Sequence, residues 1–136
     1  MGARRHDVTM RRSFALAIFT LIFPMAATAV ETAKKSTVPN RFGAIAYYRA
    51  SQSWGVGFNF ARSRDANVEA LKQCGHGKCE VVHKFKNGCA ALADGPRIHA
   101  AASGATRDEA ETKTLRRCAE LNKQASCNLV AWACTR

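Results

Sequence analysis

Hydrophobic and polar positions follow a short repeating pattern through the second two thirds of the chain. Apolar runs at 43–48 and 54–60 predict the two strands of a hairpin, because the second run alternates large apolar side chains with small or polar ones. In a half-buried strand the large side chains face the core. We therefore expect Trp54, Phe58 and Phe60 to be core residues.

A helical pattern follows this hairpin and a later one. Ser63 can cap the first helix, and Gly75 stands just past its end, where a left-handed residue often closes a helix. The second helix is predicted over 106–118, with Thr106 and Glu109 in the spacing of a capping box.

The order strand, strand, helix, strand is predicted twice, at 43–89 and at 90–136. In each half one cysteine ends the helix and another starts the closing strand. The predicted fold class is α+β: a duplicated β-β-α-β unit that forms one antiparallel sheet, with both helices on one face of that sheet.

Residues 1–29 have the pattern of a secretory signal peptide. Arginines precede an apolar run of about ten residues, and an alanine-threonine-alanine sequence places the cleavage between Ala29 and Val30. The run is shorter than the roughly 20 residues that a spanning helix needs, so no transmembrane segment is expected. We expect export to the periplasm or beyond the cell, with Met10 as an alternative start to Met1.

The polar residues 30–42 predict a flexible tether, and 43–136 a single domain. Without the leader's four arginines and one aspartate, residues 30–136 carry 17 basic and 9 acidic side chains, a net charge of +8. A basic surface suggests an unknown macromolecular partner, a protein or an anionic envelope component. Nucleic acid is not expected, because the basic residues are not interleaved with aromatic ones.

Six cysteines in an exported chain predict disulfides. Pairing within each half gives Cys74–Cys79 and Cys118–Cys127, which leaves a Cys89–Cys134 bond to tie the halves together. The loop CGHGKC at 74–79 also permits zinc binding through His76 and His83, or redox chemistry. The second half repeats the loop without a histidine, so a structural disulfide is favoured, and no metal or cofactor is expected.

Five segments resemble motifs of a known family: GAIAY at 43–47, CG at 74–75, KCEVV at 78–82, CAALA at 89–93 and WAC at 132–134. Together they resemble the bacterial family called domain of unknown function four-one-eight-nine, from about Phe42 to the C-terminus. The resemblance implies a small exported protein with no assigned activity and no catalytic residues to carry over. Some members look like secreted effectors and others like periplasmic protectors beside toxin systems. Residues 96–102 depart from the family pattern.

Candidate chemistry is sparse, and no catalytic motif is present. Two histidines and a lysine could serve acid–base and phosphate-binding roles in a small secreted hydrolase or nuclease-like toxin, and His83, Lys84 and His99 are the candidates. The helices' acidic first turns are explained by the helix dipole. For exposed contacts the candidate surface is Tyr48, Lys84, Lys86 and Trp132.

The leading interpretation is an exported, non-enzymatic binding module, of the immunity or inhibitor type or a secreted effector. The hydrolase is one alternative, and a basic structural protein of the envelope is another.

Overall fold

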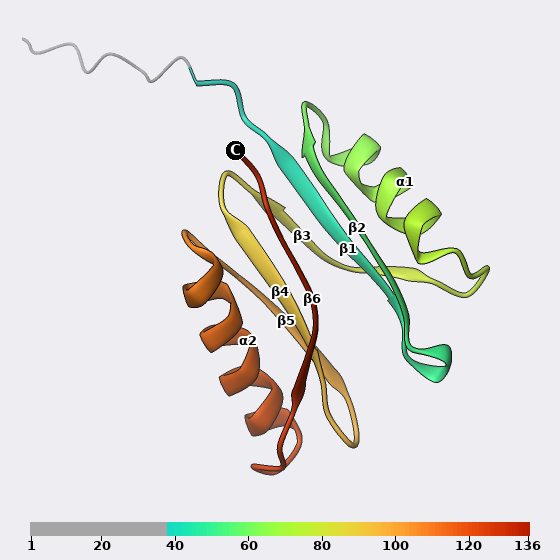
Figure 1. The fold of residues 1–136 in the computed structure, drawn as a ribbon, viewed down its shortest axis with the longest axis vertical. Helices are drawn as coiled ribbons and strands as arrows, with labels where there is room; N and C mark the ends of the chain where they lie inside the picture. Colours follow the sequence, from blue (N-terminus) through green and yellow to red (C-terminus); the bar gives the residue numbers. More distant parts are fainter. Residues whose placement is uncertain (1–37) are drawn as a thin grey trace, which may run out of the picture. The chain divides into compact units, whose positions relative to one another are not determined.

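Two three-stranded antiparallel sheets and two α-helices make up the fold (Figure 1). The computed structural model describes residues 38–136. The predicted signal peptide, its cleavage site at Ala29 and Val30, and most of the predicted tether lie outside the described residues. Residues 38–41 have no regular secondary structure, and the first strand begins at Phe42.

The elements alternate as the pattern of the chain predicts. Their bounds are β1 (Phe42–Tyr48), β2 (Ser53–Phe60), α1 (Ser63–Cys74), β3 (Glu80–Lys86), β4 (Cys89–Asp94), β5 (His99–Gly104), α2 (Arg107–Leu121) and β6 (Asn128–Cys134), with a 3-10 turn at Arg49–Ser51. Sheet A has the strand order β2-β1-β3, and sheet B has the order β5-β4-β6. The predicted α+β class is confirmed.

The prediction of one sheet with both helices on one face is wrong. The strands form two sheets that pack face to face, with α1 on the outer face of sheet A and α2 on the outer face of sheet B. The physical reason lies in the central strands, which are apolar on both sides. In β1, Ala44 and Ala46 pack against α1, while Ile45 and Tyr47 pack against sheet B. A single sheet would leave one of these apolar faces in water.

The core between the sheets holds the larger apolar side chains, and the helix interfaces hold small ones. The buried residues between the sheets are Ile45, Tyr47, Phe85, Ala90, Leu92, Ala131 and Ala133. Alanines and cysteines fill the space beneath each helix, so the helices lie close to their sheets.

The helix ends follow the predicted signals with two exceptions: the start of α1, and the end of α2, which lies at Leu121 and not at the predicted Cys118. The Thr106 hydroxyl accepts a hydrogen bond from the Glu109 N–H at 3.2 Å. Gly75 closes α1 in the left-handed conformation, with φ of 68°, and its N–H donates to the Leu71 carbonyl. Ser63 is not the cap of α1, because the residue in that position is Arg62, which makes no side-chain cap bond.

The glycines of β2 face α1, and the two large aromatic side chains on either side of them do not reach the core. A methyl group at Gly55 would lie 2.2 Å from the Ala70 carbonyl oxygen, and one at Gly57 would lie 2.2 Å from the Ala66 oxygen. The backbone of α1 therefore rests directly on these glycines. Trp54 and Phe58 are exposed, which corrects the prediction that they are core residues.

Three disulfides are present: Cys74–Cys79, Cys118–Cys127 and Cys89–Cys134. These are the pairs expected from the sequence, but the role expected for the last pair is corrected. Cys89 and Cys134 face each other on the neighbouring strands β4 and β6 of sheet B. The bond therefore closes one sheet and does not tie the two halves together.

No helix in the described part of the chain is long and apolar enough to cross a membrane.

Candidate functional site

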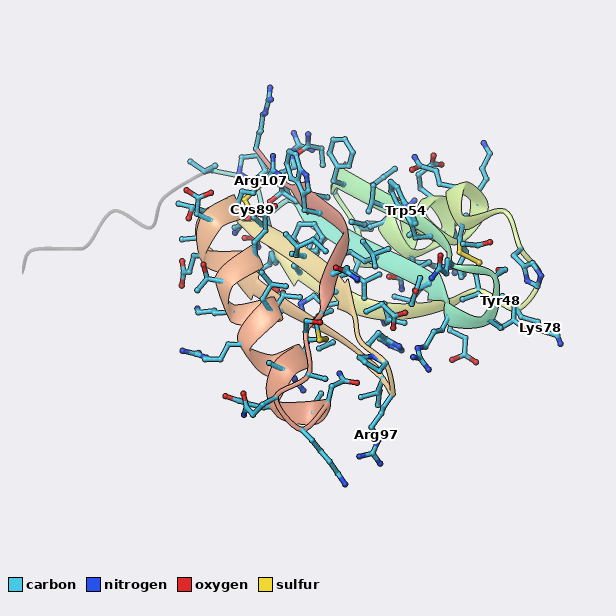
Figure 2. The ribbon with its side chains drawn as sticks, turned by 60° about the horizontal axis from the view of Figure 1, so that its bottom comes forward. Tyr48, Trp54, Lys78, Cys89, Arg97 and Arg107 are labelled. Atoms are coloured by element: carbon cyan, nitrogen blue, oxygen red, sulfur yellow. A yellow bond between two sulfur atoms is a disulfide. The ribbon has the colours of Figure 1, made fainter. Side chains whose placement is uncertain are left out.

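A row of large apolar side chains is exposed where the edge strands β2 and β6 lie beside each other. Its four residues are each between 41% and 46% exposed: Trp54 and Phe58 of β2, and Leu129 and Trp132 of β6. We call this row the β2–β6 surface. In the view of Figure 2, Trp54 and Arg107 lie on either side of the ribbon of β6. Exposed apolar side chains are ordinary when scattered, but a continuous group marks an interaction surface.

The backbone explains why these side chains gather. β2 and β6 are each the outer strand of their sheet, so no further strand covers them. Leu129 pairs with Ala93 and Trp132 pairs with Ala91, because a register shift leaves Val130 as an extra residue between them. This β-bulge brings two residues three positions apart onto the same side of β6.

A hollow of about 620 Å³ lies at the Trp54 end of the β2–β6 surface. Trp54 and Leu129, the two residues of the β2–β6 surface at this end, line it. Its other lining residues are Tyr47, Gln52, Asp94, Gly95, Pro96, Ser126, Asn128 and Val130. A ligand in this hollow would meet both apolar surface and hydrogen-bonding groups.

Asp94 is held at this hollow by an arginine. The Arg49 Nε donates to the Asp94 Oδ1 at 2.9 Å, and the two remaining guanidinium nitrogens donate to the carbonyls of Gly95 and Arg97 at 2.6 and 3.0 Å. One arginine thus joins the end of β1 to the β4–β5 turn. The carboxylate is neutralised and fixed in place.

Tyr47 is buried beneath the same hollow. Its ring packs edge-on against His99, with ring centroids 5.5 Å apart, and its hydroxyl has no hydrogen-bond partner of acceptable geometry within the described residues. Burial, and then the nearby Asp94 carboxylate, raise the pKa of Tyr47 to about 12. The phenol therefore stays neutral at physiological pH.

This pKa predicts a loss of stability in alkaline solution. The unfolded phenol ionises near pH 10, whereas the folded phenol keeps its proton up to about pH 12, so the free energy of unfolding falls as the pH rises through this window. Tyr47→Phe should remove this part of the pH dependence. Urea unfolding of the wild type and of Tyr47→Phe at about pH 9 and about pH 11 measures this dependence. An equal drop in the free energy of unfolding of the two proteins between these pH values would contradict the prediction.

A second hollow, of about 370 Å³, lies at the other end of the β2–β6 surface. Phe58, Trp132 and Arg136 line it, together with Asn59, Ala133 and Cys134. The Arg107 guanidinium stacks 3.9 Å from the centroid of the Trp132 ring. Cation–π stacking of this kind holds a tryptophan in one orientation and places positive charge beside it.

The structure does not bring together the contact surface expected from the sequence. Lys84 pairs with Ala44, and both lie on the outer face of sheet A beside α1. Trp132 lies on the outer face of sheet B, beside α2. Lys86 is exposed at the end of β3, on the α1 side. Equivalent positions in the two halves therefore point to opposite sides of the fold.

Tyr48 has a local role. Its ring stacks on His76 with centroids 4.4 Å apart, and the His76 Nδ1 accepts a hydrogen bond from the Lys78 N–H at 3.0 Å. His76 is thus part of the ordered CGHGKC loop, although its side chain remains exposed. Within residues 38–136 no three His, Cys, Asp or Glu side chains are grouped closely enough to hold a metal ion.

The two histidines of the hydrolase alternative lie apart. The His83 Nε2 contacts the Ser103 hydroxyl at 2.6 Å, whereas His99 packs against Tyr47. His99 and Ser103 stand at opposite ends of β5, about 13 Å apart at about 3.3 Å per residue. One substrate atom cannot contact both imidazoles across that distance.

Sequence reasoning missed the residues that define the β2–β6 surface, apart from Trp132. Alternation in β2 marked Trp54 and Phe58 as large residues on one face, which is correct, but alternation does not reveal that β2 is an outer strand. The alternating glycines were the available signal. They indicate that the other face of β2 meets a backbone at close range, which leaves the aromatic face away from the helix.

The fold and this surface define the class: a small α+β domain with three disulfides and an exposed aromatic edge. The chain belongs to the family described as Domain of unknown function (DUF4189), whose model matches residues 42–134. The chain is also similar to the NMR structure of Rv1813c from Mycobacterium tuberculosis, with 25% identity and a TM-score of 0.55 over 98% of this chain and 97% of that one. No curated protein matches the chain.

Proposed function

We propose that this protein is an exported binding module, without enzymatic activity, that recognises another protein through the β2–β6 surface. The observation that carries the proposal is the row of four large apolar side chains left exposed along two adjacent edge strands. Exposing such side chains costs free energy in the unbound state, since burying one fully is worth about 1.5–3 kcal/mol. A partner that covers them recovers that free energy.

The partner we propose is an extended protein segment that carries both apolar and acidic side chains. Trp54 and Phe58 are four positions apart on β2, about 13 Å at about 3.3 Å per residue, and each has a hollow beside it. Side chains of an extended segment can enter both hollows. Arg107 is paired with Glu111 at 2.6 Å, so Arg136 supplies the positive charge at the Phe58 end. Residues 30–136 have a net charge of +8, which favours carboxylates on the partner.

Export and the absence of catalysis belong to the same proposal. Disulfides between all six cysteines suit an oxidising compartment outside the cytoplasm. The separation of His83 from His99 argues against the hydrolase alternative. A basic structural role in the envelope is the competing outcome of the experiment below.

The test compares two double variants of the oxidised chain 30–136. Trp54→Ser with Phe58→Ser removes half of the β2–β6 surface. Val68→Ser with Leu71→Ser removes two exposed apolar side chains from the outer side of α1 and is the matched control. The immobilised wild-type chain is used to capture proteins from periplasm and culture medium. The captured proteins are purified, and their affinity for each variant is measured by calorimetry.

We expect the first variant to bind a retained protein at least about tenfold more weakly, which is about 1.4 kcal/mol, and the control to bind as the wild type does. Circular dichroism of both variants establishes that they are folded. Equal affinity of the two variants would overturn the proposal. Retention only on wall or membrane fractions, lost at high salt and unaffected by Trp54→Ser, would favour the envelope protein instead.

A further inference from the structure

A third hollow, which is strongly basic, lies away from the β2–β6 surface, where α2 passes over the β5 edge of sheet B. Its volume is about 570 Å³. β5 and β6 are the two opposite edges of that sheet. The lining residues are Ala102 of β5 and Lys113, Arg116, Arg117 and Glu120 of α2. This hollow shares no residue with the two hollows of the β2–β6 surface.

The positive charge in this hollow is incompletely neutralised. Three cations face one carboxylate, that of Glu120. Lys113 forms an ion pair with Glu109 at 2.5 Å, one turn earlier on the helix. Within the described residues Arg116 and Arg117 make no ion pair, and both are exposed. Two adjacent guanidinium groups therefore have donors available to a ligand.

The inner side of the same β5 edge carries a contact between the sheets. Ser103 directly follows Ala102 on β5, so its side chain points to the opposite face of sheet B, where its hydroxyl contacts the His83 Nε2 at 2.6 Å. Burial and then the Arg117 charge lower the pKa of His83. An anion bound at Arg117 would offset that charge, so the pKa of His83 should rise when one binds.

We propose that this hollow binds a phosphate group, with Arg116 and Arg117 as its main ligands. Guanidinium groups bind phosphate oxygens in pairs, and a tetrahedral dianion offers enough acceptors for two of them. A single carboxylate can satisfy only one guanidinium in this way. The phosphate group can belong to a free phosphate compound or to a lipid headgroup, and the experiment separates the two.

The experiment is a nuclear magnetic resonance titration of the oxidised chain 30–136 at constant ionic strength. Inorganic pyrophosphate is the soluble probe, and vesicles of phosphatidylglycerol are the lipid probe, with phosphatidylcholine vesicles as the blank. Arg116→Gln with Arg117→Gln removes the two main ligands. Lys84→Gln with Lys86→Gln removes two exposed cations from sheet A and is the control for loss of charge alone.

For a soluble ligand we expect saturable shifts centred on Arg116, Arg117 and Ala102, and a higher pKa of His83 when pyrophosphate is bound. The arginine variant should bind at least about tenfold more weakly, and the lysine variant less than about threefold more weakly. Binding to phosphatidylglycerol vesicles alone, with the same dependence on the arginines, supports the lipid headgroup as the source.

Two results would overturn the proposal. One is the absence of binding to both probes. The other is an equal loss of affinity in the arginine and lysine variants, which would mean that the probes bind any basic surface unspecifically. Because this hollow shares no residue with the hollows beside Trp54 and Phe58, failure here leaves the proposed protein-binding function standing.

Discussion

Replacing both Cys89 and Cys134 with alanine is expected to lower the free energy of unfolding by about 4 kcal/mol. The two residues are 45 positions apart, so their bond removes more chain entropy from the unfolded state than either of the other two bonds does. A loss of this size is a large part of the roughly 5–15 kcal/mol that stabilises a typical domain. Urea unfolding of the variant and the wild type, both purified in oxidised form, measures it.

The matched control is the double alanine variant of Cys74 and Cys79. This bond closes a loop with a sequence separation of only 5, so its removal should cost about 2 kcal/mol, roughly half as much. Both variants lose two sulfur atoms and one covalent bond, and they differ in the length of the closed loop. Equal losses in the two variants would show that loop length does not determine the effect.

Substituting Gly57 with alanine is expected to cost about 3 kcal/mol, although it adds a single methyl group. That methyl would lie 2.2 Å from the Ala66 carbonyl oxygen, which belongs to the helix backbone and cannot rotate away. The helix must then move off the sheet, which opens the alanine-filled interface beneath it. A thermal unfolding curve measures the loss.

Gly77→Ala provides the comparison for this substitution. Gly77 lies in the CGHGKC loop, and a methyl group there would meet no atom within 4 Å. We expect its unfolding free energy to stay within about 0.5 kcal/mol of the wild type. If Gly57→Ala were as well tolerated as Gly77→Ala, α1 would not rest on β2 as closely as described.

The pattern of the chain predicts the elements well, because each depends on neighbours in sequence. The helix ends at Thr106 and Gly75 follow from capping chemistry that acts within one turn. The alternation of β2 is a property of the extended backbone. The boundary at Ser63 failed by one position, since the residue before it takes the cap conformation without a side-chain bond.

The candidate site was predicted less well, because exposure depends on where a strand lies in its sheet. Trp54 has the signature of a core residue, and only the position of β2 at the edge of sheet A leaves it exposed. Lys84 and Trp132 occupy matching positions in the two halves. They would share a surface in one continuous sheet, but the packing of two sheets face to face turns them to opposite sides.

The sequence by itself therefore determined the element order, the disulfide-rich character and the family, all of which rest on local spacing and residue type. The tertiary structure decided that the strands divide into two sheets, that Cys89 and Cys134 close one of them, and that four large apolar side chains meet along the edges of β2 and β6. The physical reason is that a strand with apolar side chains on both faces can be covered on either face by a helix or by another sheet, and its sequence does not specify which. The choice follows from how the helices and both sheets together bury the most apolar surface.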